Sequence, residues 1–196
     1  MESFDKYIEQ HHDEFIEELK TFASQPSIAA TGEGIAEMAE LVQEKMEGLG
    51  ASVQMLEVAP SEPKVVYATL GEGDKTLLIY NHYDVQPVDP LDLWDSPPFE
   101  PILRENKLYG RGISDNKGNI MCRVQAIRAW QETRGELPLK IIWFIEGEEE
   151  IGSPNLEPFC MANAHLLQAD GCLWESGGVD EADRPELVLG AKGLLY

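Results

Sequence analysis

The stretch KIIWFIEGEEE, residues 140–150, decides the fold and marks the place of a site. Its first six residues are almost continuously apolar, which predicts a central strand covered on both faces, as in an α/β domain. An acidic run follows at the tip of this strand, and carboxylates gathered there repel one another unless cations neutralise them. A solvated acidic loop remains the alternative for Glu146 and Glu148. The stretch therefore predicts an α/β fold with a cation site at one strand end.

The segments on either side of this strand predict helices first, then strands, then alternating strands and helices. Helical spacing of apolar residues predicts helices over residues 3–22, 34–49, 119–131 and within 155–167, with Ser3 as the first cap. Strands are expected over residues 52–58, 65–70, 76–80, 108–112, 172–174, 187–189 and 193–196. The turn at 71–74 predicts a hairpin between the strands 65–70 and 76–80. This order indicates a three-layer α/β/α domain with a mixed sheet.

Composition excludes several classes of partner. The chain has 196 residues and is 43% hydrophobic, enough for one domain with a sizeable core. The net charge, 15 − 36 = −21, argues against binding to nucleic acid or to an anionic membrane surface. We find no secretory signal in the first fifteen residues and no membrane-spanning run of roughly 18 apolar residues. The odd, sparse cysteines fit a reducing compartment, so we expect a cytoplasmic protein: Cys122, Cys160 and Cys172.

A histidine and an aspartate follow the strand expected at 76–80. His82 and Asp84 are two residues apart, so an extended chain puts both side chains on the same side. Neutral imidazole is a good zinc ligand, and a carboxylate two residues on is placed to orient the ring. In isolation, a surface histidine beside a turn aspartate is the commoner meaning of such a pattern.

Asp115 stands in GRGISDNKG, residues 110–118, directly before a predicted helix. An aspartate in this place often caps a helix or a turn. It can instead bridge two metal ions with its two oxygens, and the flanking glycines let the backbone approach closely. A metal also accounts for one glutamate of the run 146–150 as a ligand, with a neighbouring glutamate as general base toward a bound water. Three such segments after three expected strands together predict a metal site.

The segments resemble the family of co-catalytic zinc hydrolases that contains carnosinase, cytosolic non-specific dipeptidase, acetylornithine deacetylase and succinyl-diaminopimelate desuccinylase. The resemblance extends over nearly the whole chain, and its His-Tyr-Asp-Val-Gln-Pro form is similar to the dipeptidase branch. It implies a zinc-peptidase-like catalytic domain that hydrolyses the peptide bond of dipeptides or small peptides. The motifs that carry it are NHYDVQP (81–87), WDSPPF (94–99), LYGRGISDNKG (108–118) and EGEEEIGS (146–153).

The resemblance implies a set of metal ligands. His82 matches a ligand of one zinc, Asp115 the ligand that bridges two zinc ions, and Glu150 a ligand of the other zinc. Glu175 matches a further carboxylate ligand from a later strand end, with Asp170 as the runner-up. The same ligand types accept manganese or cobalt as well as zinc.

The resemblance also implies catalytic roles and a backbone feature. Glu149 is the general base toward a zinc-activated water, and Asp84 orients the histidine ligand. The peptide bond between Asp115 and Asn116 is expected to be cis. The implied reaction is metal-assisted hydrolysis of an amide bond.

Members of this family are longer than this chain. The resemblance implies that residues 1–196 are the N-terminal portion of one catalytic domain, truncated before the lid domain that forms a homodimer. The C-terminal part of the catalytic domain, with a closing histidine ligand, is then also absent. We expect His11, His12 and His165 to be surface residues that do not replace it. The chain alone is therefore expected to be inactive and to bind at most one zinc tightly. The alternatives are an N-acyl amino acid deacylase or desuccinylase of the same family, or a non-catalytic truncated product.

Overall fold

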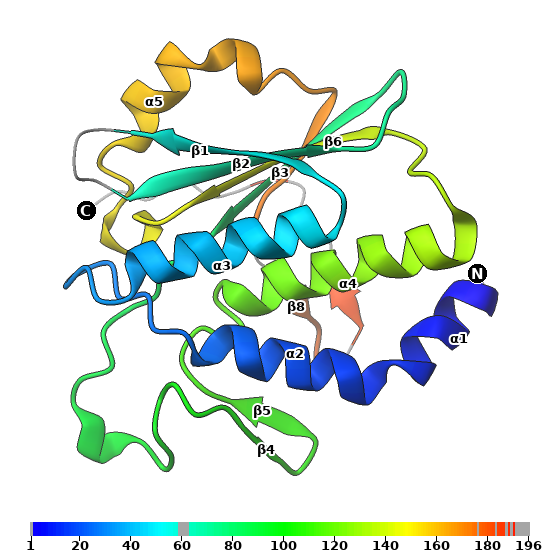
Figure 1. Cartoon of the computed structure of the whole chain (residues 1–196). Coiled ribbons are helices and arrows are strands. Elements are labelled where there is room, and N and C mark those ends of the chain that lie inside the picture. The colour runs from blue at the N-terminus through cyan, green and yellow to red at the C-terminus, as the bar shows by residue number, and fades with distance from the viewer. Residues whose placement is uncertain are drawn as a thin grey trace.

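The computed structural model describes residues 2–58, 63–175, 177–182, 184–186, 188 and 190. Helices α3 and α4 cover one face of a five-stranded sheet and α5 covers the other, which confirms the three-layer architecture (Figure 1). The strand expected over 193–196 lies outside this described part, as do residues 187 and 189 of the strand expected over 187–189. The helices are α1 (Glu2–Gln10), α2 (His12–Ser24), α3 (Ile35–Gly48), α4 (Lys117–Arg134) and α5 (Leu156–Ala162), with short 3₁₀ helices η1 (Leu91–Leu93), η2 (Glu149–Ile151) and η3 (Ala164–Leu166).

The main sheet is mixed, with the strand order β1-β2-β6-β3-β7. Its antiparallel half pairs β1 with β2 and β2 with β6, and its parallel half pairs β6 with β3 and β3 with β7. The apolar strand β6 is central, as predicted, and every residue after Lys140 is buried. The strands of this sheet are β1 (Ser52–Glu57), β2 (Lys64–Leu70), β3 (Thr76–His82), β6 (Lys140–Glu146) and β7 (Gly171–Leu173).

The hairpin expected between the strands 65–70 and 76–80 is wrong, because β6 lies between β2 and β3. A strand that is apolar on both faces loses most by standing at an edge, so β6 takes the place between them. The turn itself is present, with a positive φ of 70° at Gly71. A side chain at Gly71 would overlap the backbone of Leu139, so this turn packs against the chain that enters β6.

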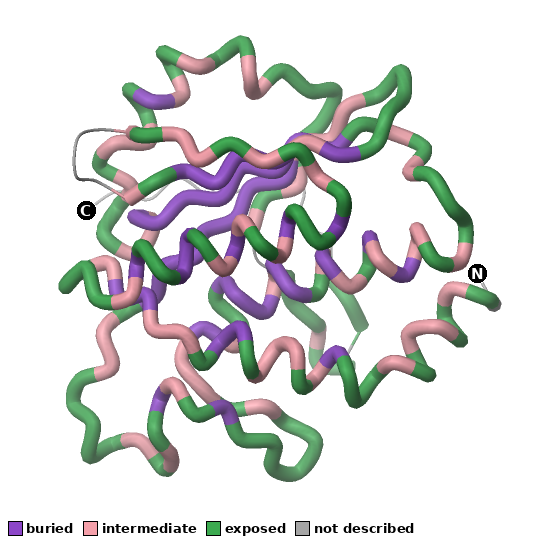
Figure 2. The backbone as a smooth tube through the Cα atoms, in the orientation of Figure 1, coloured by how far each residue is buried: buried purple, intermediate pink, exposed green. Residues whose placement is uncertain are grey.

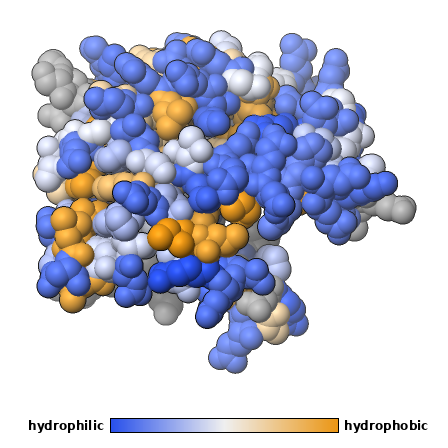
Figure 3. Space-filling model, turned by 60° about the horizontal axis from the view of Figure 1, so that its bottom comes forward, coloured by the Kyte–Doolittle hydropathy of each residue, from blue (hydrophilic) through white to orange (hydrophobic). Residues whose placement is uncertain are grey.

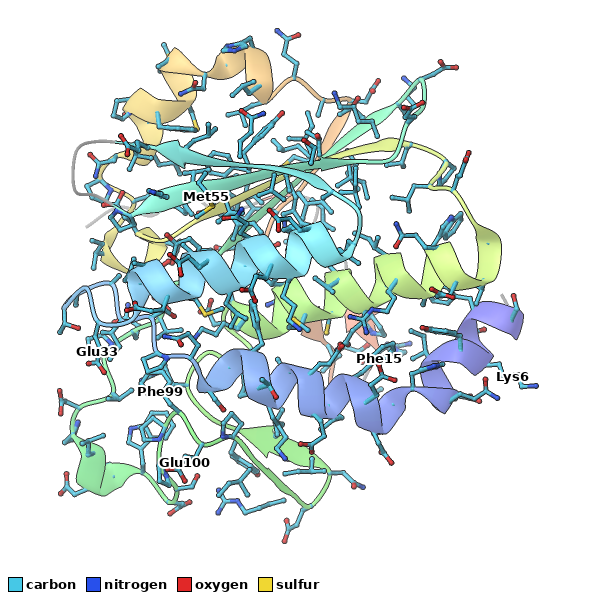
Figure 4. The ribbon with its side chains drawn as sticks, in the orientation of Figure 1. Lys6, Phe15, Glu33, Met55, Phe99 and Glu100 are labelled. Atoms are coloured by element: carbon cyan, nitrogen blue, oxygen red, sulfur yellow. The ribbon has the colours of Figure 1, made fainter. Side chains whose placement is uncertain are left out.

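The first helix is divided, where the sequence pattern predicts one helix over 3–22. The ring of His11 stacks on that of Tyr7 at 4.0 Å, and its Nδ1 lies 2.9 Å from the carbonyl oxygen of Tyr7. The backbone N–H of His11 donates to the same carbonyl at 3.1 Å, and α2 starts again at the next residue. Ser3 lies inside α1 and is not its cap. Both helices pack along α4, with Phe15 placed between α2 and α4 (Figure 4).

Two small hairpins were not predicted in full. Strands β4 (Ile102–Arg104) and β5 (Lys107–Tyr109) pair across a two-residue turn, where the sequence predicts a single strand over 108–112. Both turn residues, Glu105 and Asn106, have positive φ, as the tight hairpin turn requires, but neither is a glycine that would mark it. The second hairpin pairs β8 (Gly178–Val179) with β9 (Pro185–Glu186).

The core lies on both faces of the sheet, and buried residues concentrate on the inner strands and the inward sides of α3 and α4 (Figure 2). Alternate residues of β6 serve the two faces: Trp143 packs toward α3 and α4, and Phe144 packs toward Phe159 of α5. The face in Figure 3 is mostly hydrophilic, with apolar side chains in small groups. Among the described residues, no helix is both long and apolar enough to cross a membrane.

Gly118 provides a test of how α4 is seated. A Cβ at this position would overlap the carbonyl oxygen of Ile113, whereas a Cβ at Gly48 in α3 would meet no heavy atom within 4 Å. We expect Gly118→Ala to lower the free energy of unfolding by about 1–3 kcal/mol through overpacking. Gly48→Ala should raise it by about 0.5–1 kcal/mol, because alanine is the better helix former. Urea unfolding measures both, and equal effects of the two substitutions would contradict the close approach at Gly118.

Candidate metal centre

Three parallel strands bring the predicted site residues to one edge of the sheet. Because β3, β6 and β7 are parallel, their carboxyl ends meet at the same edge. His82 is the last residue of β3, Glu149 and Glu150 begin the η2 turn after β6, and Glu175 follows β7. Asp115 arrives from the loop before α4. Residues that are far apart in the sequence are therefore neighbours in space.

The fully buried ring of His82 points one nitrogen into a group of carboxylates. Its Nε2 atom lies 3.0 Å from Oδ1 of Asp115, 3.1 Å from Oε2 of Glu175 and 3.8 Å from Oε2 of Glu149. Three carboxylates singled out in the sequence thus converge on one atom of His82.

The carboxylate of Asp84 is fully buried and contacts both sides of the site. Its Oδ1 lies 3.3 Å from Nδ1 of His82, which is also 3.1 Å from the backbone carbonyl of Asp84. The same carboxylate accepts hydrogen bonds from the backbone N–H groups of Glu149, at 3.2 Å, and Glu150, at 2.9 Å. This geometry fits the predicted orienting role of Asp84 and adds a second effect, since it also fixes the start of η2.

Tyr83, between the two polar residues, points the other way, into the core under α3 and α4. Its ring is fully buried, and its hydroxyl donates to the carbonyl oxygen of Lys64 at 2.8 Å. A Cβ at Gly147, the first residue after β6, would overlap this ring. Only a glycine at 147 lets the acidic run approach the β3 end so closely.

The solvated acidic loop considered for Glu146 and Glu148 is wrong, because both side chains are buried. Glu146 accepts hydrogen bonds from the hydroxyls of Tyr80, at 2.6 Å, and Ser153, at 2.8 Å. Burial raises the pKa of Glu146, while these two hydrogen bonds lower it. The carboxylate of Glu148 accepts from Nδ2 of Asn155 at 2.9 and 3.1 Å. The hydrogen bonds from Ser153 and Asn155 connect the chain before η2 with the chain after it.

The structure separates the two candidates for the later carboxylate. Glu175 reaches the site, with 19% of its side chain exposed. Asp170 precedes β7 and lies at the opposite end of the sheet from the histidine. There it binds Nζ of Lys75 at 2.6 Å and the backbone N–H of Thr76 at 2.8 Å. The structure therefore does not bring Asp170 to the cluster.

A buried amide network supports the site and was not found from the sequence. The Asp115–Asn116 peptide bond is cis, which confirms the implied backbone feature. The Asn116 side chain accepts a hydrogen bond from Nδ2 of Asn81, whose Oδ1 accepts from Nε1 of Trp143 at 2.9 Å and from Arg123 at 2.5 Å. The available signal was Asn81 itself, a polar residue that continues an apolar strand. Nothing in the local pattern marks Arg123.

Gln86 is a second residue that the sequence reasoning did not place in the site. Its Nε2 donates to Oε2 of Glu150 at 2.8 Å and to the backbone carbonyl of Glu150 at 3.1 Å. This side chain fixes the direction of the Glu150 carboxylate. Its place in the same motif as His82 was the signal that could have indicated the role.

The electrostatics of the cluster favour a positive charge at its centre. Burial lowers the pKa of His82, but the adjacent carboxylates of Asp84 and Glu175 outweigh it and raise that pKa to about 11. Burial raises the pKa of Glu149, His82 lowers it, and the neighbouring carboxylates raise it again, to about 7. The carboxylates thus favour a cation at this place, where a metal ion would bind to the same atoms.

The donor atoms fit a divalent metal ion. Two sets, His82 with Asp115 and Glu175, and His82 with Glu149 and Glu150, each offer ligand atoms within 4.8 Å of one another. The Oε2 atom of Glu175 is buried and accepts no hydrogen bond from the described residues. One imidazole nitrogen with carboxylate oxygens is a ligand set that zinc and related divalent ions accept. Both sets use His82, so the described residues complete only one of them at a time.

The other histidines take no part in these sets. His12 and His165 are exposed, as expected, and His11 is half-buried in its stack on Tyr7. None of the three belongs to a potential metal-binding group within the described ranges.

Two curated proteins are similar to this chain over nearly its whole length. Human Beta-Ala-His dipeptidase is 32% identical over 220 residues, covering 100% of this chain and 42% of that protein. The Cys-Gly metallodipeptidase of Schizosaccharomyces pombe is 31% identical over 206 residues, covering 96% and 43%. The chain therefore spans less than half the length of these relatives.

Solved structures show the same fold. The crystal structure of human carnosine dipeptidase 1 matches with a TM-score of 0.84 and 30% identity, over 89% of this chain and 41% of that one. An M20 family metallo-carboxypeptidase from Sulfolobus solfataricus matches with a TM-score of 0.82 and 42% identity, over 88% and 39%. The sequence profile of peptidase family M20/M25/M40 matches residues 78–190, more than half of the chain. The chain belongs to this peptidase family.

Proposed function

We propose that the protein is a metal-dependent peptidase that hydrolyses the peptide bond of dipeptides or small peptides. The observation that carries this proposal is the convergence of Asp115, Glu149 and Glu175 on the Nε2 atom of His82. The relatives named above as dipeptidases support the substrate class.

We assign the metal ligands as follows. His82 and Glu175 would hold one metal ion, Glu150 would hold a second, and Asp115 would bridge them. Zinc suits these ligands, and manganese or cobalt are alternatives. When bound, the metal ions would polarise the scissile carbonyl and lower the pKa of the attacking water.

Glu149 has the position of a general base, because its Oε2 lies 3.8 Å from Nε2 of His82, beside the proposed metal site. It would take a proton from water and pass it to the leaving amine. The hydrogen bond from its backbone N–H to Asp84 holds the residue beside His82. Asp84 would act as the orienting residue, keeping the imidazole nitrogen directed at the metal.

We also propose that residues 1–196 are the N-terminal portion of one catalytic domain. The chain covers 42% of the human dipeptidase. As the resemblance implies, the rest of such a protein would contribute a closing histidine ligand and a homodimer contact through a lid domain. On this proposal the 196-residue chain alone is inactive.

The three cysteines are free, which supports our proposal of a cytoplasmic location.

A deacylase of N-acyl amino acids is the second candidate. A relative from Halalkalibacterium halodurans, named as an N-formyl-4-amino-5-aminomethyl-2-methylpyrimidine deformylase, is 26% identical over 157 residues. The two candidates share the metal centre and differ in the acyl group, so parallel assays with dipeptides and N-acyl amino acids separate them.

Zinc stoichiometry tests the metal site. Because this chain would offer only Asp115 and Glu150 to the second metal ion, we expect it to bind at most one zinc ion tightly. His82→Ala should abolish this binding, and the exposed His165→Ala should leave it unchanged. Metal analysis after dialysis and calorimetric titration give the result. Two tightly bound zinc ions per chain, or full binding by His82→Ala, would contradict the assignment.

Dipeptide hydrolysis tests the catalytic roles. We expect no zinc-dependent turnover of small dipeptides by the 196-residue chain, since the second metal ion lacks a closing ligand. In a protein that carries the remaining part of the catalytic domain, Glu149→Gln should lower kcat by about 10²–10⁴-fold with little loss of zinc. The exposed Glu157→Gln serves as the control. Robust turnover by the chain alone would refute its inactivity, and an active Glu149→Gln variant would refute the base assignment.

A further inference from the structure

Strand β7, which ends shortly before Glu175, joins the sheet through a short ladder. Its pairing with β3 stops two residues before Glu175, whereas the pairing of β3 with β6 continues to His82. The pairing of β3 with β6 therefore fixes the backbone of His82. Glu175, in contrast, lies beyond the last backbone pair between β3 and β7. The three pairs of the short ladder are Leu77 with Gly171, Leu78 with Cys172 and Ile79 with Leu173.

The side chain of Arg123, from α4, crosses the space where further rungs would lie. Its Nη1 donates to the backbone carbonyl of Tyr80 at 3.3 Å and to Oδ1 of Asn81 at 2.5 Å, and its Nη2 donates to the backbone carbonyl of Trp174 at 3.0 Å. These acceptors stand on β3 and after β7, directly before the two metal-facing residues. A single planar cation thus ties both strand ends together.

The carboxylate of Glu175 depends on this backbone tie. Its Oε2 is buried and accepts no hydrogen bond from the described residues, although it lies 3.1 Å from Nε2 of His82. The neighbouring ring of Trp174 stacks on Tyr80 at 4.0 Å, which reinforces the same connection between β7 and β3. The position of Glu175 is therefore set by the segment that carries it.

We propose that Arg123 is a positioning residue of the metal centre, which sets the separation of Glu175 from His82 by bridging the ends of β3 and β7. This inference rests on the proposed metal-binding function. Arg123 touches neither of the metal-facing atoms. Arginine suits the task because its rigid fork donates to several acceptors at once, whereas lysine offers a single ammonium group.

Metal affinity measured on the apo protein tests the proposal. We expect Arg123→Gln to weaken zinc binding by about 10–100-fold, as the loss of an outer partner of a ligand does. Arg123→Lys should lose less, and the visible spectrum of the Co²⁺-loaded protein should change in both variants. Arg128→Gln is the matched control, because Arg128 lies on the same helix and binds Glu18 at 2.9 Å. It should cost stability without changing zinc affinity or the spectrum.

A double-mutant cycle shows whether the effect passes through Glu175. In a Glu175→Gln background, Arg123→Gln should cost little further zinc affinity. Circular dichroism identifies folded variants, and Arg123→Lys replaces Arg123→Gln if the latter does not fold. Unchanged zinc affinity in the Arg123 variants, or an equal loss in the Glu175→Gln background, overturns the inference while the metal site stands. A wild-type protein that binds no zinc overturns the proposed function itself.

Discussion

The buried carboxylate of Asp84 is the constraint on which the site depends. An ionised carboxylate taken out of water is costly unless polar partners surround it. Asp84 obtains its partners from the imidazole of His82 and from the backbone N–H groups of Glu149 and Glu150. His82 ends β3, and the two N–H groups follow β6. The partners of one buried carboxylate therefore join the ends of two strands. The order of the sheet then decides what else can reach them, since the end of β7 lies on the other side of β3.

Much of the fold follows from local pattern, because helix periodicity and an apolar strand are short-range properties. The stretch 140–145 is predicted as a central strand, and the structure places β6 there. Pairing between strands is a long-range property. The turn at Gly71 was therefore predicted, but the position of β6 between the strands on either side of that turn was not. The division of the first helix at His11 and the hairpin turn at Glu105 and Asn106 depend on side-chain contacts or backbone angles. These cannot be predicted from the residue types alone.

The candidate site shows the same division between local and long-range information. His82, Asp115, Glu149, Glu150 and Glu175 belong to short motifs, and the structure brings all of them to one edge of the sheet. Their partners were not predictable in this way, because Arg123 acts across the gap between two strands and no spacing in the sequence encodes that contact. The burial of Glu146 and Glu148 was not predictable either. The sequence of an acidic run does not show whether its side chains are solvated or bind Tyr80 and Asn155.

The close approach of Gly147 to Tyr83 has a consequence for how this chain can diverge. The tyrosine fills the core directly between two polar site residues, and the glycine leaves the space that its ring occupies. A larger residue at 147 requires a smaller one at 83, and a smaller residue at 83 leaves a void beneath the acidic run. The two positions therefore form one steric unit, and we expect them to covary among descendants of this sequence even though neither offers an atom to the metal.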